Sequence, residues 1–205
     1  MLSIYLQGFI LTAGLIIAIG AQNAFVLSNA VRGNHPLMIA ALCAAGDLLL
    51  IGIGLAGVGT LVASHPEMMR YAALGGALFL GVYGAFALRS ALRGNDGLQT
   101  EKTLPLTRGA LILSTLAVTF LNPHAYLDTV VLIGSIGGQF PLEQRLIFGA
   151  GAVTASIAWF FALGFGGPML APLFRRTSSW RMLDGMVCLV MWGIALTLVK
   201  PYLLG

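Results

Sequence analysis

The sequence has 205 residues, of which 58% are hydrophobic and 9% are charged, and its mean hydropathy is +0.92. Soluble domains carry roughly a quarter of charged residues, so this composition excludes an ordinary soluble enzyme or binding domain and indicates an integral membrane protein. The formal net charge of +4 comes without a basic stripe interleaved with aromatic residues, so it does not indicate a nucleic-acid partner.

Six apolar segments are predicted to form membrane-spanning helices, because a helix needs roughly 18 to 20 residues to cross the hydrocarbon core. The first segment lacks the basic start of a secretory signal, so we expect it to be a retained span. The predicted spans are Ser3 to Ser28, Leu37 to Ala63, Glu67 to Leu88, Gly109 to Ile136, Leu146 to Phe165 and Met182 to Leu198. This pattern predicts an all-α membrane protein with one transmembrane domain over residues 1–205; five spans with one re-entrant run is the alternative.

The basic residues predict how these spans are oriented. Most of them fall in the loops that follow spans 1, 3 and 5, namely Arg32, Arg89, Arg93, Lys102, Arg108, Arg175, Arg176 and Arg181. Since Lys and Arg are enriched on the cytoplasmic side of membrane proteins, we expect these loops in the cytoplasm and both termini in the periplasm.

Six spans also allow an inverted repeat of three plus three helices. Spans 1 and 4 then enter the membrane from opposite faces, and the repeats are residues 1–90 and 109–205 with a short cytoplasmic linker at 91–108. A faint echo relates "NAFVL" in span 1 to "HAYLD" in span 4, each beside a predicted helix break. Many secondary transporters pair broken helices around a site at the midplane in this way.

Asp47 is the first polar residue that the membrane makes costly. It lies about ten residues into the second span, roughly 15 Å from its start at 1.5 Å per residue. An aspartate at that depth costs about 2.5 to 3.5 kcal/mol on insertion scales, and such residues commonly mark a transport pathway. The alternative is a protonated or paired aspartate that only joins helices.

Asn122 and Pro123 predict a break in the fourth span. A proline removes one backbone hydrogen bond and clashes with the preceding turn, while asparagine is a favoured N-cap and proline a favoured first helical residue. A second half-helix is therefore expected to start at Pro123, with free N–H groups that suit a carboxylate. The alternative is an ordinary proline kink satisfied by neighbouring helices.

Further polar residues accompany these two breaks. His124 and Asp128 are four positions apart and share a helical face, so they could pair and relay a proton near neutral pH; alternatively, backbone carbonyls satisfy His124. In span 1, the amides of Gln22 and Asn23 can bind a ligand or hydrogen-bond a neighbouring helix. Trp159 is expected to pack in the interior, with a cation–π contact as the alternative.

Four motifs make the chain resemble the lysine and arginine exporter family of bacterial inner membranes, the LysE type, and most closely its arginine-exporter branch. They are "GAQNAFVL" from Gly20, "LCAAGDLLL" around Asp47, "AVTFLNPHAYLDTVVLIGSIGGQ" from Ala117, and "ASIAWF" from Ala155. Family members commonly have proline where this chain has Ala21, so a break in span 1 is less firmly expected than the break in span 4.

This resemblance implies a secondary-active exporter of L-arginine, L-lysine or both, and proton antiport is the simplest coupling for such export. The substrate-binding residues that it implies are Gln22, Asn23, Asp47, Asn122, Pro123 and Asp128, and proton coupling would use Asp47, Asp128 and His124. It implies no catalytic residue, metal or cofactor, and it allows a homodimer. The chemistry agrees, because a basic amino acid offers a carboxylate and two cationic groups.

Two other functions use membrane-embedded acids. An intramembrane aspartyl protease has a dyad that shares a proton, but its Tyr-Asp and Gly-x-Gly-Asp motifs differ from Ala45-Gly46-Asp47 and Tyr126-Leu127-Asp128. A divalent-metal exporter would need more oxygen or imidazole ligands than two acids and one histidine provide.

Overall fold

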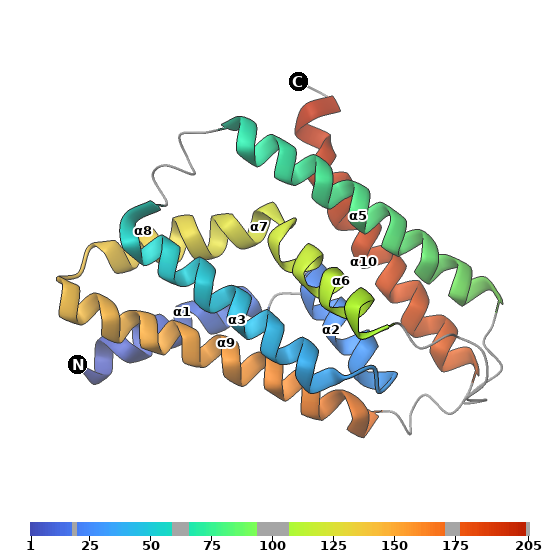
Figure 1. Ribbon diagram of the computed structural model, residues 1–205, viewed down its shortest axis with the longest axis horizontal. Helices are drawn as coiled ribbons and strands as arrows, with labels where there is room; N and C mark the ends of the chain where they lie inside the picture. The colour runs from blue at the N-terminus through green and yellow to red at the C-terminus, as the bar shows by residue number, and fades with distance from the viewer. Residues whose placement is uncertain (18–19, 59–65, 94–106, 171–176, 204–205) are drawn as a thin grey trace.

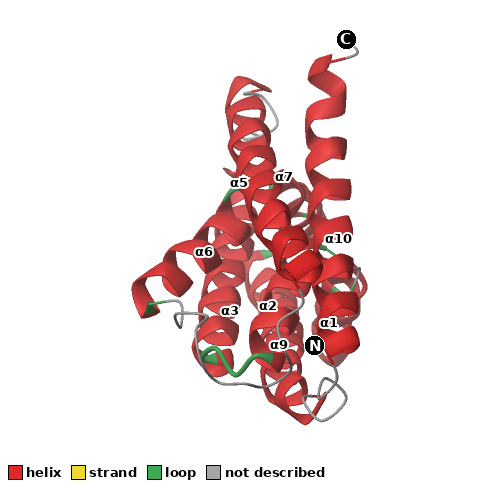
Figure 2. Ribbon diagram, turned by 90° about the vertical axis from the view of Figure 1, so that its right-hand side faces the viewer, coloured by secondary structure: helices red, strands yellow, loops and turns green. Residues whose placement is uncertain are grey.

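A computed structural model of the chain describes residues 1–17, 20–58, 66–93, 107–170 and 177–203. These residues form helices and short connections, with no strand among them (Figure 2). The all-α prediction is confirmed over this part of the chain. The last residues of predicted span 2 and most of the predicted linker 91–108 lie outside it.

Every predicted span corresponds to helix in the described residues, although spans 1, 2 and 4 are divided. The elements are α1 (Leu2–Ile16), α2 (Ala21–Val31), α3 (Pro36–Ile53), the π-helical η1 (Gly54–Val58), α5 (Pro66–Arg93), α6 (Arg108–Phe120), α7 (Pro123–Ala125), the π-helical η2 (Tyr126–Ile133), α8 (Gly134–Gly138), α9 (Leu142–Leu170) and α10 (Thr177–Leu203).

Four of these helical stretches are each long and apolar enough to cross a membrane: Pro36–Gly57, Leu74–Leu92, Leu142–Leu170 and Arg181–Lys200. The pair α1 and α2 makes a fifth candidate if it counts as one bent span. Helix α6 and the stretch Tyr126–Gly138 are apolar but shorter than a full crossing. The chain is therefore a multi-pass membrane protein with four to five candidate spans among its described residues.

The helix of the first segment is interrupted near Gly20. Helix α1 ends at Ile16, Gly20 is extended with φ −128° and ψ 171°, and α2 starts at the next residue. The axes of α1 and α2 differ by 77°. The interruption exists here although position 21 is an alanine and not a proline.

The helices pack as two long pairs with shorter elements between them (Figure 1). Helix α1 lies along α9, which also packs on α3, and α5 lies along α10. The shorter elements α2, α6 and α7 connect the two pairs, since α2 contacts both α9 and α10 and α6 contacts both α3 and α5. The interruptions in the first and fourth segments therefore adjoin elements that lie between the two pairs.

Glycines permit the close contact between α1 and α9. A Cβ atom on Gly8 would overlap the backbone carbonyl of Phe148, and one on Gly151 would overlap that of Tyr5. Such small residues allow two helix backbones to approach in membranes, where apolar side chains gain little from association.

Candidate functional site

A cavity of about 290 Å³ lies where the two helix interruptions meet α3. Every predicted site residue except Pro123 lines it; Pro123 starts α7 beside the cavity, and its side chain is outside the described part of the structure. The lining residues are Leu15, Ile16, Gly20, Gln22, Asn23, Asp47, Asn122, His124, Ala125, Asp128, Thr129, Ile133, Phe160 and Ile194. Residues far apart in the sequence are thus brought to one place.

Asp47 is a buried acid that retains an open binding position. Its residue is 3% exposed, and its Oδ2 atom accepts a hydrogen bond of 2.7 Å from the Ser156 hydroxyl of α9. Within the described residues, no Lys or Arg forms an ion pair with Asp47, and no donor reaches Oδ1. A buried carboxylate without a cation is costly, so this position favours a positively charged ligand.

Asn122 controls the start of the second half-helix. Its Oδ1 atom accepts the His124 N–H at 3.1 Å, and its backbone carbonyl accepts the Ala125 N–H at 3.0 Å. The predicted break and N-cap are therefore present. The sequence predicted free N–H groups at this start, but Asn122 itself accepts the N–H groups of His124 and Ala125. Its Nδ2 group, which makes no hydrogen bond to another described residue, remains available for an anion.

Asp128 and His124 both line the cavity without pairing. The structure gives no hydrogen bond or ion pair between their side chains, nor from either side chain to any other described residue. Asp128 lies in η2, where the wider π-helical turn replaces the α-helix, and single π-helical turns are frequent at functional sites. Asp128 is therefore a second acid that lines the cavity, and no Lys or Arg of the described chain forms an ion pair with it.

Gln22 and Asn23 use their amides on neighbouring helices. The Gln22 Nε2 atom donates to the Thr119 hydroxyl of α6 at 3.1 Å. The Asn23 Nδ2 atom donates to the Ile16 carbonyl at 2.6 Å, and its Oδ1 accepts from the Trp159 indole at 3.1 Å. These contacts agree with the helix-to-helix alternative, although both residues also line the cavity.

Comparison with known proteins shows to which family the chain belongs. The sequence profile of the family described as LysE type translocator matches residues 13–201. The chain belongs to this family. It is 44% identical over 200 residues to an arginine exporter protein ArgO of Enterobacter sp. (strain 638), covering 98% of this chain and 95% of the relative. No solved structure matches it.

Two further relatives agree with this assignment. The translocator is 43% identical to an arginine exporter protein ArgO of Serratia proteamaculans (strain 568), with 97% of each chain covered. It is 44% identical to a putative amino-acid transporter YggA of Aeromonas salmonicida, over 98% of this chain and 97% of the relative. The resemblance noted from the motifs is confirmed. The chain is a transporter and not an enzyme, so the protease alternative is removed.

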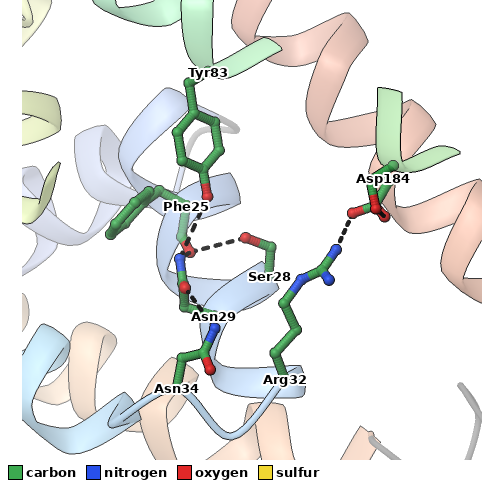
Figure 3. Close-up of polar contacts among 8 residues, drawn as sticks. Phe25, Ser28, Asn29, Arg32, Asn34, Tyr83 and Asp184 are labelled. Atoms are coloured by element: carbon green, nitrogen blue, oxygen red, sulfur yellow. Dashed lines mark hydrogen bonds and ion pairs between the residues drawn. The ribbon is translucent and has the colours of Figure 1, made fainter. Parts of the chain in front are cut away.

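Besides Asp47, the described part of the LysE-type translocator has a second buried acid, Asp184 of α10, which the sequence analysis did not single out. It is 4% exposed, and it forms an ion pair with Arg32 at the end of α2 (Figure 3). Ser90 of α5 donates to its Oδ2 at 2.6 Å. Nearby, Asn29 donates to the Tyr83 hydroxyl at 3.5 Å. Asp184 lies within the sixth apolar segment, and an acid inside an apolar segment is a signal by which the sequence could have identified it.

The bonding partners of Asp184 differ from those of the two acids that line the cavity, Asp47 and Asp128. Asp184 has an arginine and a hydroxyl on its two oxygens, as a buried structural carboxylate requires. Asp47 has one hydroxyl, and the side chain of Asp128 forms no hydrogen bond or ion pair with a described residue. Nor do any three His, Cys, Asp or Glu residues of the described chain gather as a metal site would need. Asp47 and Asp128 thus differ from Asp184, because no Lys or Arg of the described chain forms an ion pair with either of them.

Proposed function

We propose that this translocator exports basic L-amino acids, L-arginine or L-lysine, from the cytoplasm by secondary-active transport. The observation that carries the proposal is one cavity lined by two acids, Asp47 and Asp128, to which no described cation is bound. The relatives named arginine exporters, which align over nearly the whole chain, favour arginine as the first substrate to test.

The size and chemistry of the cavity suit one amino acid. Its 290 Å³ is close to the lower limit of the roughly 300 to 1,000 Å³ that ligand pockets occupy. In the proposed complex, the cationic groups of the substrate approach Asp47 Oδ1 and Asp128, and the Asn122 Nδ2 group donates to the α-carboxylate. His124 lies one residue into α7 and can add a second donor.

Energetics favour coupling to a proton. Moving a monocation outward against an inside-negative potential costs about 2.3 kcal/mol per 100 mV, which proton uptake in exchange offsets. The titratable groups that line the cavity are Asp47 on α3, His124 on α7 and Asp128 on η2. We propose that the acids hold substrate and proton alternately, with His124 assisting the proton step.

The proposed mechanism is alternating access in an inverted repeat of three plus three spans. Here α1 with α2 is span 1, and α6 with the helix from α7 to α8 is span 4. Exchanging each span with its counterpart preserves the main contacts: α1 packs on α9 as α6 packs on α3, while the α3–α9 and α5–α10 pairs map onto themselves. Both termini are then periplasmic, in a bacterial inner membrane.

Flux through purified protein tests this function. In proteoliposomes loaded with labelled arginine or lysine, we expect efflux that rises when the outside is acidified while valinomycin and potassium hold the potential at zero. Protein-free vesicles are the control for leakage. Flux of neither amino acid above that control would contradict the export function, whereas flux that ignores the pH gradient would contradict only the proton coupling.

A further inference from the structure

Asn23 lies across the interruption between α1 and α2. Its Nδ2 group donates to the carbonyl of Ile16, the last residue of α1, at 2.6 Å. The final carbonyls of a helix have no partner within the helix and need an outside donor. Asn23, in the first turn of α2, therefore caps the C-terminal end of α1. The axes of these two helices differ by 77°.

Trp159 of α9 forms a hydrogen bond with the oxygen of the same Asn23 amide. Its indole N–H donates to Asn23 Oδ1 at 3.1 Å, and an indole nitrogen can only donate. Trp159 is absent from the residues that line the cavity, whereas Asn23 is among them. The tryptophan thus meets the site through Asn23, and a cation–π contact to bound substrate has no support in this arrangement.

The same face of α9 also carries the hydroxyl that hydrogen-bonds Asp47 in the cavity. Ser156 and Trp159 are three residues apart, which places them on one helical face. Ser156 donates to Asp47 and Trp159 donates to Asn23, so one stretch of α9 orients groups on α3 and on α2. A rigid helix can keep the acid and the interrupted segment in register with each other.

We propose that Asn23 and Trp159 act together as positioning residues that hold α2 against α9, and that Asn23 is not a ligand of the substrate. The proposal rests on the function proposed above and refines it, because the family resemblance made Asn23 a substrate contact. The three hydrogen-bonding groups joined here, from Ile16, Asn23 and Trp159, form one chain, so breaking either link releases the same constraint.

A double-mutant cycle tests whether Asn23 and Trp159 act as one unit. Asn23→Ala and Trp159→Phe should each weaken arginine binding to purified protein about 10-fold, because the released segment must be ordered again on binding. The double variant should also lose about 10-fold, since both changes remove one constraint. A loss of roughly 100-fold in the double variant would show two independent contributions and overturn the proposal.

Tryptophan fluorescence gives a second measurement that leaves the pair intact. The chain has three tryptophans, so Trp180→Phe with Trp192→Phe leaves Trp159 as the only emitter. Trp192 can be replaced without removing a contact of the cavity, because its indole donates to the Gly81 carbonyl, away from the cavity lining. Arginine should change the emission of this single-tryptophan protein, and the change should be lost on adding Asn23→Ala, which removes the acceptor of the Trp159 indole but keeps the emitter.

The outcomes distinguish this inference from the function on which it rests. If the wild type binds arginine but emission from Trp159 alone does not respond, the positioning role is wrong and the export function stands. If the wild type binds neither arginine nor lysine, the proposed function fails and this inference fails with it. Because the fluorescence measurement keeps Trp159 and Asn23, it decides the question even if Trp159→Phe does not fold.

Discussion

Replacing Asp47 with asparagine is expected to reduce arginine efflux about 100-fold, with a similar loss for Asp128→Asn. Truncating one partner of a buried charge pair removes about 2 to 5 kcal/mol, and roughly 2.8 kcal/mol corresponds to a factor of 100. The fold should survive in Asp47→Asn, because the Ser156 hydroxyl can donate equally well to an amide oxygen. Efflux from proteoliposomes measures the effect.

The matched control for these variants is Glu143→Gln. Glu143 is an exposed acid in the first turn of α9 and does not line the cavity, so its efflux should equal that of the wild type. Undiminished efflux from both aspartate variants would remove the proposed role of the acids, and an equal loss in Glu143→Gln would point to a general charge effect instead.

A second large effect is expected at the contact between α1 and α9. In Gly8→Ala and Gly151→Ala the added methyl group meets a backbone carbonyl of the opposite helix, Phe148 or Tyr5 respectively. A backbone cannot rotate away as a side chain does, so overpacking should lower the free energy of unfolding by about 1 to 3 kcal/mol. The apparent melting temperature of the purified protein in detergent should fall in both variants.

Gly14→Ala, on the same helix α1, tests whether the effect is steric. Nothing lies within 4 Å of a Cβ atom at Gly14. Alanine favours a helix over glycine by about 1 kcal/mol, so this variant should melt at the wild-type temperature or slightly above it. Equal destabilisation in all three variants would mean that the loss of glycine, and not the close approach, sets the stability.

Local sequence signals predicted the helices and the interruptions in spans 1 and 4 because those features depend on neighbouring residues. The apolar runs set the helix positions, and the Asn122-Pro123 pair set the break, through a cap and a missing N–H that act within a few residues. The π-helical form of η2 was not predicted; η2 contacts η1 and α3, which are distant in the sequence.

The polar partners were less accessible to prediction because they lie far apart in the chain. Asp47 and Ser156 are 109 positions apart, Asn23 and Trp159 are 136 apart, and Arg32 and Asp184 are 152 apart. Residue type showed that each polar group needs a partner in the membrane, but only the packing of α9 and α10 shows which partner it has. The sequence therefore predicted the residues around the cavity better than their roles.

The most direct test is a pair of binding isotherms on purified protein, one for L-arginine and one for L-citrulline. Citrulline keeps the length of arginine but lacks its side-chain charge, so the comparison isolates what Asp47 and Asp128 contribute. We expect arginine to bind at least roughly 30-fold more tightly, corresponding to about 2 kcal/mol for a desolvated charge pair. Equal affinity for the two amino acids would contradict the account that the cavity acids hold a cation.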